Sequence, residues 1–235
     1  MELRSSAPPV AFALWRAAWA AMTRKALLHP AAKPVVFVIA LLPFAWLLFA
    51  AMTNQLGPNP AEALLRSSGN WTLRALCLVL LVTPLRVLTH TPALARFRRM
   101  LGLFVYFYAV VHMLSSSWFD MGFDVADIWK DIVKRPFILV GFTAFVLLTT
   151  LAATSFNRVV KALGAKRWQT LHKLVYAVAC LAILHFFWMR AGKNDFADVF
   201  VYAGILAVLL GWRIVRAWKA RRRQPYRSVE SGTDA

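Results

Sequence analysis

Cysteine and acidic residues are scarce in this sequence, and each shortage excludes a class of protein. Only two cysteines occur among its 235 residues, Cys77 and Cys180, and both lie inside apolar runs. Neither a disulfide framework nor a cysteine-based zinc site is therefore expected, and both side chains are interpreted as small core residues. Aspartate and glutamate number 10 against 28 lysines and arginines, so the net charge is +18. The basic residues cluster between and beyond the apolar runs, as in the flanks of membrane helices, which argues against a nucleic-acid partner.

Nucleotide-binding signatures are also missing. The sequence contains no GxGxxG or Walker-type phosphate loop, no internal repeat and no low-complexity tract. We therefore expect no soluble domain in this chain.

Apolar residues, in contrast, are abundant and make up 60% of the chain. Several uninterrupted apolar runs are long enough to cross about 30 Å of hydrocarbon. Hydropathy predicts six membrane-spanning helices, at Val35–Ala51, Trp71–Leu88, Leu101–Trp118, Phe137–Ala153, Leu171–Trp188 and Phe196–Trp212. The expected fold is an all-α integral membrane protein, a six-helix transmembrane bundle.

The basic residues predict how the bundle is oriented. Six spans place both termini on one side, which carries twenty lysines and arginines against six on the other side. By the positive-inside bias, both termini are expected in the cytoplasm. The transmembrane domain is expected over residues 34–215, between an N-terminal extension (1–33) and a basic cytoplasmic tail (216–235). The extension is interpreted as an interfacial amphipathic helix or a disordered segment, because Arg16 interrupts its apolar stretch and no clear signal-peptide cleavage site follows.

Two histidines, His112 and His185, lie deep inside predicted spans. An imidazole in the membrane is costly unless a metal, a cofactor or a polar partner satisfies it, so it marks a functional site by default. With a helix rise of about 1.5 Å per residue, both histidines fall at the same level, in the outer half of the membrane. Two neutral imidazoles that face each other from neighbouring helices supply both axial nitrogens of a b-type haem, which then transfers electrons. The pair therefore predicts a bis-histidine haem.

A third histidine, His172, begins the fifth predicted span near the cytoplasmic face. Thirteen residues at about 100° each place it roughly 140° around the helix from His185, so the two side chains do not point the same way. The third span offers no second histidine at the matching level, because arginines stand there. His172 is expected to bind a second haem with an unusual partner, or to hydrogen-bond a quinone or a flavin. The other two histidines, His29 and His90, are interpreted as solvated.

Two loops carry charges that could serve a partner or a ligand. On the outer side, four aspartates recur at spacings of four, three and four, which aligns them if the loop forms a short helix: Asp120, Asp124, Asp127 and Asp131. They could dock a basic redox partner or form only a solvated helix face. On the cytoplasmic side, six basic residues could hold a flavin phosphate or anionic lipid headgroups, or act only as topology determinants. They are Arg96, Arg98, Arg99, Lys161, Lys166 and Arg167.

The motifs that surround these histidines occur in a specific order. They are TPLR (83–86), RRMLGL (98–103), YAVVH (108–112), KRPFILVG (134–141), AATS (152–155), LGAKRWQTLHKLVY (163–176) and LHFFW (184–188). This ordered set closely resembles the MsrQ (formerly YedZ) family, the haem-binding membrane subunits of the bacterial periplasmic methionine sulfoxide reductase system. That family belongs to the ferric-reductase-like transmembrane superfamily. The resemblance covers residues 34–215.

The resemblance implies a multi-pass cytochrome of the bacterial inner membrane that binds b-type haem and FMN. Such a protein takes electrons from the quinol pool or from a cytosolic flavin reductase. It passes them to MsrP, a periplasmic molybdopterin enzyme that repairs oxidised methionines, and so acts as the electron-transfer subunit of an oxidoreductase complex. His112, His172 and His185 match the haem-associated histidines of the family. The first 33 residues are a departure, because this extension is longer than the family leads us to expect.

Three other functions remain open from the residues alone. The chain could be a stand-alone transmembrane ferric or quinone reductase, or a non-catalytic anchor for a periplasmic enzyme. It could also be a small-solute transporter whose histidines relay protons, although such transporters usually show paired broken helices that this sequence lacks. A visible spectrum of the purified protein separates these functions, because only a cytochrome requires reducible haem bands.

Overall fold

The computed structural model describes residues 24–192 and 194–222. The described residues form helices joined by short connections, with no strand among them. Most of the predicted N-terminal extension (1–23) and the end of the predicted tail (223–235) lie outside the described residues.

Within the described part of the chain, six helices are long and apolar enough to cross a membrane. They are α2 (Ala32–Met52), α3 (Pro60–Leu88), α4 (Arg98–Met121), α6 (Pro136–Ala153), α8 (Leu174–Ala191) and α9 (Ala197–Arg222). Three shorter helices connect them: η1 (Pro92–Phe97), α5 (Val125–Lys134) and α7 (Asn157–Leu171). The predicted all-α fold with six membrane helices is confirmed.

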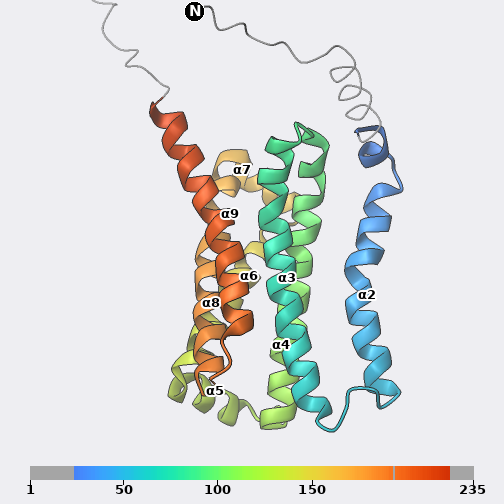
Figure 1. Cartoon of the computed structure of the whole chain (residues 1–235), viewed down its shortest axis with the longest axis vertical. Helices are drawn as coiled ribbons and strands as arrows, with labels where there is room; N and C mark the ends of the chain where they lie inside the picture. Colours follow the sequence, from blue (N-terminus) through green and yellow to red (C-terminus); the bar gives the residue numbers. More distant parts are fainter. Residues whose placement is uncertain (1–23, 193, 223–235) are drawn as a thin grey trace, which may run out of the picture.

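The short helices α7 and α5 lie at opposite ends of the bundle (Figure 1). Helix α2 begins and helix α9 ends at the end that carries α7. These two ends are named the α7 end and the α5 end below. The most extensive packing between helices is that of α3 on α4 and of α6 on α8.

The largest difference from the predicted boundaries is at α3, which begins at Pro60 and not at Trp71. Asn59 caps this end, because its side-chain oxygen accepts a hydrogen bond from the backbone N–H of Glu62 (3.1 Å). Proline fits the first helical position, where no N–H donor is needed. The added turns are partly polar, so hydropathy left them out although they are helical.

The fifth span, in contrast, begins later than predicted. Helix α7 ends at Leu171 and helix α8 starts at Leu174, so His172 lies in the turn between them. The predicted angle between His172 and His185 assumed one continuous helix, and that assumption is wrong.

The core of the bundle lies between α3, α4 and α8. Its most buried side chains include Leu76, Val105 and Val178, one from each of these helices. Helix α2 is joined to α4 by a hydrogen bond from the Tyr108 hydroxyl to the Ala40 carbonyl (2.7 Å). Many large apolar side chains remain exposed on the outer faces of the long helices. Such faces suit helices that contact lipid.

Candidate functional site

His112 from α4 and His185 from α8 face each other inside the bundle. Their ring centres lie 6.3 Å apart, and the ring planes are inclined by 77°. Each histidine lies nearer to the α5 end of its helix than to the α7 end. The fold therefore brings together the two histidines that the sequence places at one level.

The separation of the two rings suits a metal ion held between them. A bond from imidazole to a metal is about 2 Å and the ring nitrogen lies about 1 Å from the ring centre, so two opposed ligands have ring centres about 6 Å apart. Among the described residues, no group of three or more His, Cys, Asp or Glu side chains could hold a metal. A set of two nitrogens fits a haem iron, because the macrocycle supplies the other four ligands.

Both rings are oriented by backbone carbonyls of neighbouring helices. Nδ1 of His112 donates to the Leu65 carbonyl of α3 (3.0 Å), and Nδ1 of His185 donates to the Phe137 carbonyl of α6 (2.7 Å). The Ser68 hydroxyl also lies 3.3 Å from Nδ1 of His112. Because a carbonyl only accepts, Nδ1 carries the proton in each neutral ring and Nε2 keeps its lone pair. Histidines that ligate metals commonly use their second nitrogen in this way.

His172 lies apart from this pair, at the α7 end. Its ring lies against Trp168, with ring centres 3.9 Å apart, and its Nδ1 donates to the Trp168 carbonyl (3.0 Å). Its Nε2 lies 3.3 Å from the Ser155 hydroxyl. Burial lowers the pKa of His172 below its ordinary value, although hydrogen bonds to backbone carbonyls partly oppose this shift. The neutral imidazole that results can act as a ligand or as a hydrogen-bond acceptor.

A cavity of about 240 Å³ opens beside His172. Four basic side chains line this His172 cavity, and no acidic side chain does: Arg98, Arg99, Lys173 and Arg213. The rings of Trp168 and Tyr176 form another part of the lining, and the Arg213 guanidinium lies 5.8 Å from the centre of the Tyr176 ring. Positive charge beside aromatic faces suits a planar anionic ligand. Of the six basic residues considered from the sequence, only Arg98 and Arg99 line this cavity.

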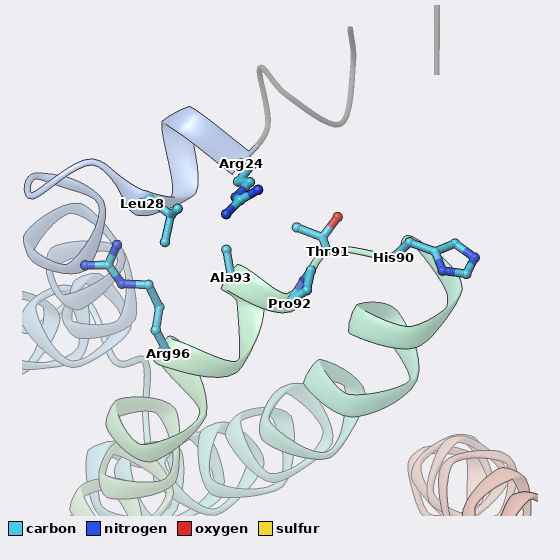
Figure 2. A pocket seen from close by; sticks show the side chains of 7 residues that line it. All are labelled: Arg24, Leu28, His90, Thr91, Pro92, Ala93 and Arg96. Carbon is cyan, nitrogen blue, oxygen red and sulfur yellow. The ribbon is translucent and has the colours of Figure 1, made fainter. Parts of the chain in front are cut away.

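A larger cavity, of about 780 Å³, lies where the first described helical turn (24–28) meets η1. Figure 2 shows Arg24 and Arg96 on opposite sides of it, while His90 points away from the other labelled side chains. Arg96 donates to the Leu27 carbonyl (2.7 Å) and so ties the two segments together. None of His112, His172 and His185 lines this cavity, which makes it a poor candidate for electron transfer.

The loop predicted on the outer side contains the short helix α5 that the aspartate spacing predicts, but the four aspartates do not share one free face. Asp124 caps α5 by accepting hydrogen bonds from two backbone N–H groups (2.8 and 3.0 Å). Asp131 is largely covered and pairs with Arg135 (2.8 Å). Asp120 belongs to the end of α4. Asp120 and Asp127 are thus the exposed carboxylates without these structural roles.

An arginine that was not predicted from the sequence as a functional residue lies in the middle of a span. Arg74 lies at the midpoint of α3, where its Nε donates to the Tyr202 hydroxyl (3.0 Å) and its guanidinium lies 4.7 Å from the centre of the Trp71 ring. Its side chain forms no ion pair with a described acidic residue. A lone arginine inside an apolar run is itself a signal of function, and it could have been recognised.

Known proteins resemble this chain over most of its length. Residues 68–183 match the family model of the ferric reductase like transmembrane component. The chain is 73% identical to the protein-methionine-sulfoxide reductase heme-binding subunit MsrQ of Polaromonas naphthalenivorans, over 88% of this chain and 95% of that protein. Proteins of the same name from Herminiimonas arsenicoxydans and Bordetella pertussis are 53% and 52% identical, over 81% and 80% of this chain and 88% and 91% of theirs. No solved structure matches the chain.

The segment that matches the family model contains His112 and His172, and His185 follows just beyond its end. The three relatives each match 80% or more of this chain and 88% or more of their own length. The protein is therefore a multi-pass membrane protein, and it belongs to the MsrQ family.

Proposed function

We propose that this protein is a transmembrane b-type cytochrome that carries electrons across the bacterial inner membrane. The observation that carries the proposal is the pair of facing imidazoles of His112 and His185, whose ring centres lie 6.3 Å apart. In both rings Nδ1 donates a hydrogen bond to a backbone carbonyl, so both Nε2 atoms are available as ligands. The relatives are named heme-binding subunits, which supports haem as the group bound here.

The haem, when bound, supplies reversible one-electron chemistry. His112 and His185 would hold its iron through their Nε2 atoms, and a haem held by two imidazoles would supply electron transfer. The carbonyls of Leu65 and Phe137 hold the Nδ1 protons and raise the basicity of the ligating nitrogens. The role of the chain is thus to ligate the haem iron, to bury the haem and to orient the two imidazoles. These effects together set the reduction potential of the haem.

The direction of transfer follows from the orientation that we propose. We place the α7 end in the cytoplasm, because basic side chains gather there as the positive-inside bias requires. The histidine pair then lies in the periplasmic half of the membrane. The relatives are named subunits of a protein-methionine-sulfoxide reductase. The acceptor that we propose is therefore a periplasmic, molybdopterin-dependent catalytic subunit similar to MsrP, and this chain acts as its electron-transfer subunit.

The His172 cavity is the place where we propose that electrons enter the protein. It would lie at the cytoplasmic face, and its basic and aromatic lining suits a planar redox group. A second haem, FMN and a quinone all match this description, because each is planar and the first two carry anionic groups. His172 would ligate or hydrogen-bond that group through Nε2, which now lies 3.3 Å from the Ser155 hydroxyl. The donor would be the quinol pool or a cytosolic flavin reductase.

Spectra of histidine variants test the proposal directly. The purified protein should show a six-coordinate, low-spin haem that dithionite reduces. His112→Ala and His185→Ala should each abolish the same low-spin signal, because the loss of either imidazole leaves the iron five-coordinate. His90→Ala is the matched control, since His90 is exposed at the α7 end and should not affect the signal. A normal low-spin spectrum in either ligand variant would contradict the pairing.

A further inference from the structure

Each of the two facing histidines packs directly against a glycine of a neighbouring helix. His112 lies on Gly69 of α3, and His185 lies on Gly141 of α6. A Cβ atom added at Gly141 would lie 2.7 Å from Nδ1 and 2.8 Å from Cε1 of His185, which is closer than real contacts allow. A Cβ atom added at Gly69 would lie 3.1 Å from Cε1 and 3.2 Å from Nδ1 of His112. As the rings now lie, any other residue is excluded at Gly141 and crowded at Gly69.

The two glycines occupy the same place relative to the carbonyls that the histidines bind. Leu65 precedes Gly69 by four residues, and Phe137 precedes Gly141 by four residues. In an α-helix the carbonyl of residue i points toward the N–H of residue i+4. A side chain from another helix therefore approaches that carbonyl past residue i+4, and glycine has no Cβ atom to obstruct it. The same carbonyl and glycine arrangement thus occurs twice, once for each histidine.

We propose that Gly69 and Gly141 are positioning residues for His112 and His185. The space that they leave lets each imidazole reach its carbonyl, and the resulting hydrogen bond fixes the Nδ1 proton and the direction of Nε2. This inference rests on the proposed haem site, but it concerns how the ligands are held and not whether they bind. It is specific to these two positions, because an added Cβ atom at Gly204 of α9 would meet nothing within 4 Å.

Alanine variants of the full-length protein test this role. In Gly141→Ala the His185 ring must move away from the Phe137 carbonyl, so its hydrogen bond and its axial ligation weaken together. We expect most of the ferrous haem in this variant to bind carbon monoxide, which the six-coordinate wild-type haem does not bind. Any haem that remains six-coordinate should have a higher reduction potential, because an imidazole without that hydrogen bond is a less basic ligand. Gly69→Ala should act in the same direction on His112, with a smaller effect.

Gly204→Ala is the matched control, because it makes the same substitution in a membrane helix where space is open. This variant should keep the haem spectrum and the reduction potential of the wild-type protein, and it should not bind carbon monoxide. Alanine also favours a helix more than glycine does, so loss of helix cannot explain an effect at Gly69 or Gly141. If Gly141→Ala does not accumulate in the membrane, Gly69→Ala tests the inference instead. The His112 ring would have to shift by only a few tenths of an ångström to accommodate that added Cβ atom.

Wild-type carbon monoxide reactivity and potential in both Gly69→Ala and Gly141→Ala would overturn the inference and leave the haem site intact. An equal effect of Gly204→Ala would also overturn it, because any added methyl group would then have the same consequence. Failure of the proposed function would look different. In that case the wild-type protein would lack a low-spin haem, or His112→Ala would retain it.

Discussion

The distance between the His172 cavity and the histidine pair predicts that the redox equilibrium responds to the membrane potential. With a rise of about 1.5 Å per residue, the part of α8 from Leu174 to His185 spans about 17 Å, roughly half of the hydrocarbon thickness. One elementary charge moved across the whole membrane is worth about 2.3 kcal/mol per 100 mV. An electron that moves from the cavity to the pair should therefore gain about 1.3 kcal/mol per 100 mV, close to a tenfold change in its equilibrium constant.

This prediction can be measured on protein in sealed vesicles. An impermeant redox buffer is placed only on the side of the α7 end, and a potassium gradient with valinomycin sets the potential. With the α7 side negative, haem reduction should increase, and the apparent midpoint should shift by roughly half of the imposed potential. The same vesicles without valinomycin are the control and should show no shift.

Two outcomes would refute the reasoning. An apparent midpoint that does not respond to the potential would mean that electrons reach the pair without crossing the low-dielectric interior. A shift equal to the full imposed potential would place the haem at the far membrane surface, which the position of His185 along α8 does not allow.

Two further predictions concern the ends of the electron path. His172→Ala should keep the low-spin signal of the His112–His185 pair but slow its reduction from the α7 side, because His172 lies in the cavity at that end. Stopped-flow absorbance measures the rate of reduction. Loss of all haem in this variant would contradict the placement of His172 apart from the pair. Neutralising Asp120 and Asp127 together should slow electron transfer to the catalytic subunit at low salt, with the difference shrinking toward about 0.5 M salt, where exposed charges are screened. Haem content should not change in that double variant, and unaltered kinetics at low ionic strength would show that these carboxylates form only a solvated surface.

The fold could be predicted from the sequence largely because membrane helices are defined by long apolar runs. The same reasoning explains why the level of His112 and His185 was predictable, since helix rise converts sequence position into depth. The start of α3 at Pro60 was not predictable by hydropathy, because its capped first turns are partly polar. The turn at His172 was missed because hydropathy places the start of a span only to within a few residues, and α8 starts at Leu174, three residues after the predicted start.

The finer geometry of the site depends on contacts between helices that are distant in sequence. The hydrogen bonds of the two histidines go to the carbonyls of Leu65 and Phe137, and a carbonyl has no sequence signature. The contacts with Gly69 and Gly141 depend on how α4 packs on α3 and how α8 packs on α6. Such details become visible only when the helices are placed in space.

The position of Arg74 has a consequence for the way the protein is made. An arginine at the centre of a membrane helix raises the free energy of translocon-mediated insertion of that helix by about 2.5–3.5 kcal/mol. Helix α3 alone should therefore insert into the membrane inefficiently. It should insert more stably once α4 follows and packs along it. The two helices would then enter the lipid as one hairpin. His112 and the backbone carbonyl that orients it would reach the membrane together, before α6 and α8 enter it.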